Sequence, residues 1–105
     1  MTFVETSVFT RRMKGLLEEE EYRLLQLHLV LQPQAGAVIR GSGGLRKMRW
    51  SLGSRGKRGG VRIIYFWLKE RRRIMLLLIY PKPERDDLTR HQLKVLRKIV
   101  EREYS

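Results

Sequence analysis

Two long apolar runs, one closely following the other, constrain the fold of this 105-residue chain more than any other feature. The segments VRIIYFWL (61–68) and IMLLLIY (74–80) are apolar at nearly every position, and only KERRR separates them. Such runs, rich in β-branched and aromatic residues, are typical of central strands that are covered on both faces. The sequence therefore predicts two buried strands with other elements packed against them.

A third strand is expected just before these two, where the pattern changes to a period of two. In LRKMRW (45–50), Lys47 and Arg49 point to one face while Met48 and Trp50 point to the other. This alternation predicts a strand with one face on the core and two cations directed to the exposed side.

One cation lies inside the first apolar run. Arg62 shares its face with Ile64 and Phe66, where a charge is out of place unless that end of the face opens into a site. The glycine-rich, basic segment 51–60 that precedes the run predicts a loop.

The N-terminal third predicts a short strand (2–6) and two helices. The first helix should begin at Thr6 or Ser7, since both are good N-cap residues. In the second (18–32), four glutamates favour a helix N-terminus, and two adjacent stripes of leucines predict a broadly buried helix.

A last helix is predicted near the C-terminus. Thr89 and Gln92 have the spacing of a capping box, and apolar residues recur with helical period after them. The order β-α-α-β-β-β-α predicts an α+β fold with a small, mostly antiparallel sheet, and the length suits a single domain over residues 1–105.

Positive charge is concentrated in the middle third of the chain. The net charge of +12 divides into −1 for residues 1–39, +11 for 40–73 and +2 for 74–105. Because charge of one sign disfavours the compact state, such a concentration indicates a polyanionic partner, with a merely solvated face as the alternative.

Several classes of site are disfavoured. The chain has no cysteine and only His28 and His91, so a zinc site is not expected, and neither a signal peptide nor a membrane span is recognisable. We therefore expect a cytoplasmic protein without metal or other cofactor. Asp86 and Asp87, just before the last helix, are interpreted as turn and helix-dipole residues.

The basic residues themselves are the candidates for function. Arginine and lysine bind phosphate through charge-assisted hydrogen bonds, and a lysine crowded by other cations has a lowered pKa that suits proton transfer. The aromatic residues 50, 65, 66 and 67 are interpreted as core, whereas Tyr80, at the end of its strand, is the best candidate for an exposed aromatic.

Three segments together resemble the HigB-type branch of the RelE superfamily, the toxins of bacterial type II toxin-antitoxin pairs. They are GGLRKMRW (43–50), SRGKRGGVRIIYFW (54–67) and LLLIYPKPERDDLTRHQLKVL (76–96), and the resemblance extends over essentially the whole chain. It implies a small twisted sheet with two N-terminal helices on one face and a C-terminal helix.

The resemblance also implies a function. Such proteins are ribosome-dependent, metal-independent endoribonucleases that cut mRNA in the ribosomal A site through its 2′-hydroxyl and halt translation. The implied partners are the 70S ribosome, mRNA and a helix-turn-helix antitoxin of the HigA type. No membrane or small-molecule cofactor is implied.

Site residues follow from the matched positions. The implied catalytic residues are Lys47, Arg49, Arg62 and Lys82, and the predicted RNA-binding residues are Arg46, Arg55, Lys57, Arg58 and Tyr80. Two positions depart from the best-known RelE enzymes: Pro83 replaces an arginine, and Thr89 replaces a tyrosine before the last helix. The roles of those two positions are therefore not carried over.

Two other classes of function remain open from the residues alone. A non-catalytic RNA- or ribosome-binding module would share the basic surface. A DNA-binding regulator would need a basic recognition helix, and the helix predicted at 18–32 is instead acidic at its start and apolar beyond it.

Overall fold

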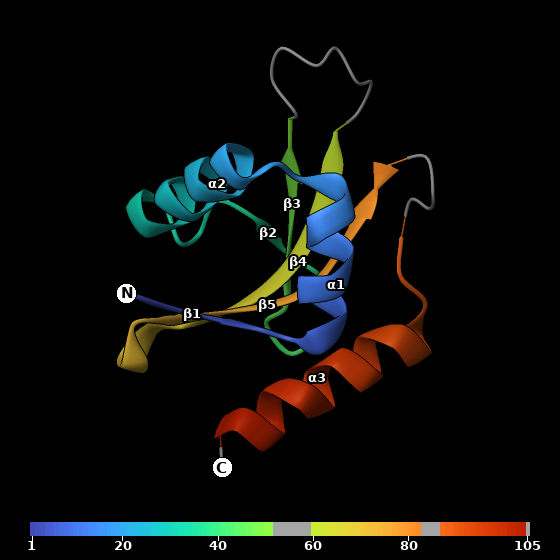
Figure 1. Cartoon of the computed structure of the whole chain (residues 1–105). Coiled ribbons are helices and arrows are strands. Elements are labelled where there is room, and N and C mark those ends of the chain that lie inside the picture. The colour runs from blue at the N-terminus through green and yellow to red at the C-terminus, as the bar shows by residue number, and fades with distance from the viewer. Residues whose placement is uncertain (52–59, 83–86, 105) are drawn as a thin grey trace.

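The computed structural model describes residues 1–51, 60–82 and 87–104 (Figure 1). In chain order the elements are β1 (Thr2–Glu5), α1 (Ser7–Leu16), α2 (Glu19–Leu31), β2 (Ala37–Val38), β3 (Arg46–Trp50), β4 (Val61–Leu68), the 3-10 helix η2 (Lys69–Arg71), β5 (Arg73–Pro81) and α3 (Arg90–Tyr104). The predicted α+β fold and the predicted order of its main elements are confirmed.

One five-stranded sheet forms the centre of the molecule, with strand order β1-β5-β4-β3-β2. The two apolar runs are β4 and β5, an antiparallel pair with a register shift at Ile64/Tyr65. The sheet is mostly antiparallel, as predicted, but β1 pairs with β5 in parallel at one edge. The short strand β2, which the sequence did not predict, pairs with β3 at the other edge.

The two faces of this sheet carry different helices (Figure 1). On one face, Phe9 of α1 and Leu25 and Leu29 of α2 pack with sheet residues such as Ile63 and Tyr65. On the other face, Leu96 and Val100 of α3 pack with alternate sheet residues, among them Ile64 and Tyr80. Because both faces are covered, nearly every position of β4 and β5 is buried, which explains their unbroken apolar sequence.

Helix α2 is less buried than the sequence predicted. Leu25 and Leu29 are fully buried, but Leu24, Leu27 and Leu31 are 43%, 48% and 71% exposed. The prediction of a broadly buried helix was therefore wrong, because the sheet covers only one of the two leucine stripes and nothing among the described residues covers the second.

Both predicted helix starts are observed. The Thr6 hydroxyl accepts a hydrogen bond from the Phe9 amide at 3.0 Å. In the capping box of α3, the Gln92 amide donates to Thr89 Oγ1 at 3.1 Å, and the Thr89 amide donates to Gln92 Oε1 at 2.8 Å. Thr89, one of the two departures from the toxin pattern, thus accepts a hydrogen bond from a backbone amide in the first turn of α3.

Replacing Thr89 with alanine is expected to lower the free energy of unfolding by about 0.5–2 kcal/mol, the usual cost of losing an N-cap side chain. Urea denaturation measures this change. Thr89→Ser is the matched control because it keeps the hydroxyl and should stay close to wild type. Equal losses in both variants would contradict the capping role.

No helix within the described ranges is long and apolar enough to cross a membrane.

Candidate functional site

Three of the predicted site residues form a row across the sheet. Arg49 of β3 lies directly opposite Arg62 of β4, and Arg62 lies directly opposite Tyr80 of β5. Paired residues of antiparallel strands point to the same face, so all three side chains lie on the α3 face. Lys47, two residues from Arg49 on β3, shares that face. We call Lys47, Arg49, Arg62 and Tyr80 the basic row.

The depth of the side chains differs along the basic row. Arg62 is only 5% exposed and Tyr80 only 1%, whereas Arg49 is exposed and Lys47 half-buried. The expectation of an exposed Tyr80 was therefore wrong, because Tyr80 packs in the same cluster as Leu96 and Val100 of α3. In the basic row, Arg62 and Tyr80 are therefore buried, whereas the two cations on β3 are accessible.

Arg49 and Arg62 are like charges paired across neighbouring strands. Like charges directly opposite one another on neighbouring strands destabilise a sheet. A phosphate placed between them would turn this repulsion into attraction and could accept forked hydrogen bonds from a guanidinium. The arrangement therefore favours an anion over any neutral ligand.

Lys47 has an acidic neighbour in the described structure. Its Nζ lies 2.8 Å from Oδ1 of Asp87, just ahead of α3. The hydrogen bond from Lys47 and its positive charge lower the pKa of Asp87 below the ordinary 3.8. Asp87 thus bonds to a member of the basic row, a contact that the helix-dipole interpretation did not foresee, while Asp86 lies outside the described residues.

Replacing Lys47 with glutamine should raise the pKa of Asp87 back to its ordinary range, which carboxyl NMR titration would detect. A folded-state pKa below the unfolded value stabilises the protein above the unfolded pKa, and this contribution is lost as pH falls through the folded pKa. As the pH falls below the ordinary pKa of Asp87, the wild type should therefore lose a contribution to its free energy of unfolding that Lys47→Gln lacks at every pH. Arg11→Gln on α1 is the control, and the same Asp87 titration in wild type and Lys47→Gln would contradict the pairing.

Lys82 follows β5 at the same end of the sheet. Its backbone amide donates to the carbonyl of Gly60, which precedes β4, at 3.4 Å, and its side chain is exposed. Lys82 therefore lies two positions beyond Tyr80, next to the start of β4, near the basic row but not in it.

Arg46 lies on the opposite face of the sheet. It pairs with Tyr65, and its Nη1 donates to the carbonyl of Gly36 at 2.7 Å. The Tyr65 side chain bonds to the same segment, which connects α2 to β2. Its hydroxyl donates to the Pro33 carbonyl and accepts from the Gly36 amide, both at 2.8 Å. The structure therefore does not bring Arg46 to the basic row. Its side chain instead connects β3 to the segment that follows α2.

Three further predicted RNA-binding residues, Arg55, Lys57 and Arg58, lie outside the described residues, as does Pro83. Among the residues that are described, no group of three histidine, cysteine, aspartate or glutamate side chains is arranged to hold a metal ion.

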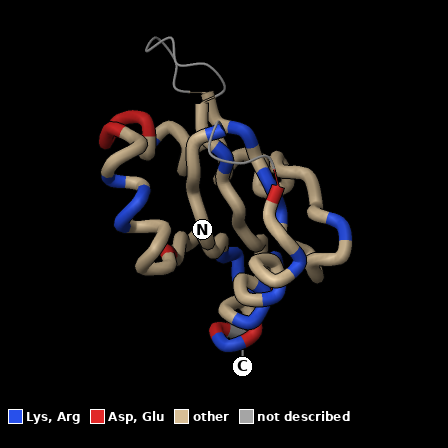
Figure 2. Tube along the Cα trace, turned by 90° about the vertical axis from the view of Figure 1, so that its right-hand side faces the viewer, with Lys and Arg blue, Asp and Glu red and all other residues tan. Residues whose placement is uncertain are grey.

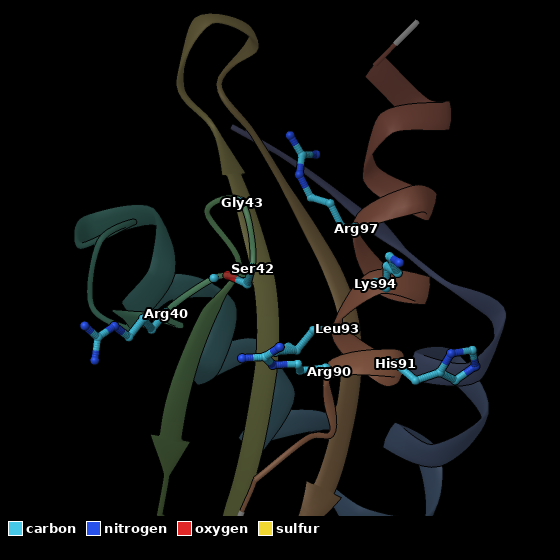
Figure 3. A pocket seen from close by; sticks show the side chains of 9 residues that line it. Arg40, Ser42, Gly43, Arg90, His91, Leu93, Lys94 and Arg97 are labelled. Atoms are coloured by element: carbon cyan, nitrogen blue, oxygen red, sulfur yellow. The ribbon is translucent and has the colours of Figure 1, made fainter.

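Sequence reasoning missed a second group of cations on α3. Arg90, Lys94 and Arg97 are spaced i, i+4 and i+7, so they form one stripe along the helix. They line a hollow of 830 Å³ between α3 and the segment 40–43 (Figure 3). The helical spacing of the three cations was the signal that could have revealed them.

The charged residues are unevenly distributed in space. Figure 2 shows most Lys and Arg along the sheet and α3, with others on α1, whereas the acidic residues gather chiefly where α2 begins and at the C-terminal end of α3. The first turn of α2 holds Glu19, Glu20 and Glu21. The α3 face of the sheet is therefore the face suited to a polyanion.

Comparison with solved structures identifies the same fold elsewhere. The intact E. coli RelBE toxin-antitoxin complex contains a chain that matches with a TM-score of 0.57 and 15% identity, covering 76% of this chain and 94% of that one. A mutant of the E. coli toxin RelE in the free state matches with a TM-score of 0.58 and 14% identity, covering 96% and 95%. No family model matches the sequence. At these identities the likeness shows a shared fold.

Proposed function

We propose that this protein is the toxin of a toxin-antitoxin pair and acts as an endoribonuclease on mRNA at the ribosome. The observation that carries the proposal is the cross-strand pair of Arg49 and Arg62, with Lys47 on the same face. Two arginines held opposite one another on a sheet are positioned to bind a single phosphate group, and strands hold such groups more precisely than loops do. The fold shared with RelE and the resemblance of the sequence support the same conclusion.

The proposed reaction is transphosphorylation by the RNA itself. The 2′-oxygen attacks the adjacent phosphorus in line, the bond from phosphorus to the 5′-oxygen breaks, and the products end in a 2′,3′-cyclic phosphate and a 5′-hydroxyl. The 2′-hydroxyl loses a proton to a base, and the departing 5′-oxygen gains one. The protein must therefore align the phosphate, stabilise its developing charge and transfer two protons.

The residues of the site are assigned to these tasks as follows. Arg62 contacts the scissile phosphate and stabilises the charge that develops on it. Lys47 and Arg49 bind the phosphate and assist proton transfer, with Lys82 close to the same end of the sheet. Lys57 and Arg58 are proposed to anchor the RNA backbone. Because Asp87 bonds to Lys47, an incoming phosphate competes with that carboxylate for the lysine.

The proposed partners are the ribosome, mRNA and a helix-turn-helix antitoxin of the HigA type. A toxin-antitoxin complex is among the structures that share this fold. Co-expression with the product of a neighbouring helix-turn-helix gene tests the last partner: growth should be restored and the two proteins should copurify.

Primer extension on cellular messages after induction of the protein tests the proposed activity. Cuts within codons are expected, and purified ribosomes programmed with a message should yield fragments that end in a cyclic phosphate. A message with a single 2′-deoxynucleotide at the cut site is the matched control, and it should resist cleavage there. Intact messages with stalled translation would instead favour a non-catalytic ribosome-binding module.

A further inference from the structure

One hollow in the described structure lies beside α3, and no residue of the basic row lines it. Its walls are the segment 40–43 and the first turns of α3, and its volume is 830 Å³ (Figure 3). Arg90, Lys94 and Arg97 line it from α3, and Arg40 lines it from the facing segment. We call this site the α3 hollow.

Within the described parts of the chain, the cations of the α3 hollow have no acidic residue paired with them. No aspartate or glutamate is among the described residues that line it, and none of Arg40, Arg90, Lys94 and Arg97 forms an ion pair within the described parts of the chain. Like charges at i, i+4 on a helix repel one another, so this stripe lowers helix stability unless an anion is bound. The uncompensated charge favours a ligand with more than one negative group.

Arg97 is held in place without an acceptor. Its guanidinium lies over the Phe66 ring, 5.3 Å from the centroid, and its Nη1 is buried with no hydrogen-bond partner among the described residues. A Cβ on Gly43 would lie 2.5 Å from Arg97 Nε, so the absence of a side chain at Gly43 makes room for the arginine. Figure 3 shows Arg90 and Arg97 extending from α3 toward the side of segment 40–43, while His91 points away.

The α3 hollow adjoins a second hollow that reaches Lys47 of the basic row. This second hollow of 440 Å³ on the same face is lined by Lys47, Ile64 and Asp87, and it shares Arg40 and Leu93 with the α3 hollow. A strand lying across Lys47 can therefore follow the surface past Arg40 to the cations of α3. Leu93 is the one apolar side chain among the nine described residues that line the α3 hollow, whereas apolar residues such as Val38, Ile64 and Leu88 line the second hollow.

We propose that the α3 hollow binds the phosphate backbone of single-stranded RNA, several nucleotides away from the phosphate on the basic row. The inference rests on the proposed function, because it continues the path of the same RNA strand. Arg90 and Lys94, one helical turn apart, contact successive phosphates, and the fixed guanidinium of Arg97 borders their path. These contacts set affinity and register rather than the chemistry of cleavage.

Binding of 2′-O-methyl RNA, which lacks the nucleophile, tests the α3 hollow separately from cleavage. A trinucleotide and a longer strand are each titrated over a range of salt concentrations. In Arg90→Gln/Lys94→Gln the longer strand should bind at least about tenfold more weakly at low salt, and its slope of log K against log salt should fall by roughly 0.7 for each lost phosphate contact. The trinucleotide should bind as it does to wild type.

Arg11→Gln/Lys14→Gln is the matched control, because it removes the same charge from α1 on the other side of the sheet. Equal weakening in both double variants would overturn the proposal, as would wild-type binding of the longer strand by Arg90→Gln/Lys94→Gln. Binding of polyglutamate that depends on Arg90 and Lys94, with no such dependence for RNA, would overturn it in favour of an acidic protein partner.

The two proposals can fail separately. A protein that cuts messages, but whose Arg90→Gln/Lys94→Gln variant keeps the wild-type salt slope, contradicts only the α3 hollow. A protein that shows the predicted salt slopes but leaves all messages intact contradicts only the nuclease. Circular dichroism of each variant establishes that the fold is retained.

Discussion

Replacing Arg62 with glutamine should reduce RNA cleavage by about 10²–10³-fold or more and abolish growth arrest on induction, because the developing charge on phosphate loses its buried donor. Single-turnover cleavage on programmed ribosomes measures the chemical step directly. Arg62→Lys keeps the charge but loses the planar fork, so it should recover only part of the rate.

Two controls separate this effect from loss of the fold. Arg72→Gln removes one positive charge from an exposed residue between η2 and β5, at the opposite end of β4 from Arg62, and should cut RNA like wild type. Thermal unfolding followed by circular dichroism should find Arg62→Gln folded, since glutamine keeps a polar side chain at this position. A folded Arg62→Gln variant with undiminished cleavage would contradict the assignment.

Replacing Gly60 with alanine should destabilise the protein by at least about 2 kcal/mol, through left-handed strain and a steric clash. Gly60 has φ +57°, and a Cβ there would meet the Trp50 carbonyl oxygen at 2.2 Å. Its carbonyl also accepts from the Lys82 amide, so a shift at Gly60 disturbs the ends of three strands. Urea denaturation should find a lower midpoint. RNA cleavage should also fall, because Arg62 is only two residues from Gly60 and a backbone shift there would displace it.

Gly15→Ala is the control of opposite sign. Gly15 lies within α1, and a Cβ there would meet no atom within 4 Å. The substitution should stabilise the protein by up to about 1 kcal/mol, because alanine is the better helix former. Equal urea midpoints for Gly60→Ala and Gly15→Ala would contradict the predicted steric clash at Gly60.

Local patterns were sufficient to predict much of the fold. The two apolar runs became the central strands, and the capping residues Thr6 and Thr89 begin α1 and α3. These features depend on residues close together in the chain, where hydrophobic period and capping chemistry act directly. The same period in β3 placed Lys47 and Arg49 on one face, and it also implies that Arg46 points with Met48 to the other.

The errors arose where distant segments decide burial. Tyr80 ends an apolar strand and would be exposed without α3, but Leu96 and Val100 pack in the same cluster and cover it. The outer leucines of α2 follow the helical pattern as well as Leu25 does, yet the sheet covers only one stripe. Similarly, the α3 hollow needs segment 40–43 as its second wall, and no local pattern connects that segment to α3.

The parallel pairing of β1 with β5 also sets an order for folding. Thr2 pairs with Arg73, and the Thr6 hydroxyl donates to the Leu77 carbonyl across 71 positions of the chain. Contacts of such high sequence separation require loop closure before they add stability, so they form late. A chain emerging from the ribosome therefore holds β1 without a partner until β5 has been synthesised. Since β5 also supplies Tyr80, which lies opposite Arg62, the basic row is assembled only when most of the protein has been made.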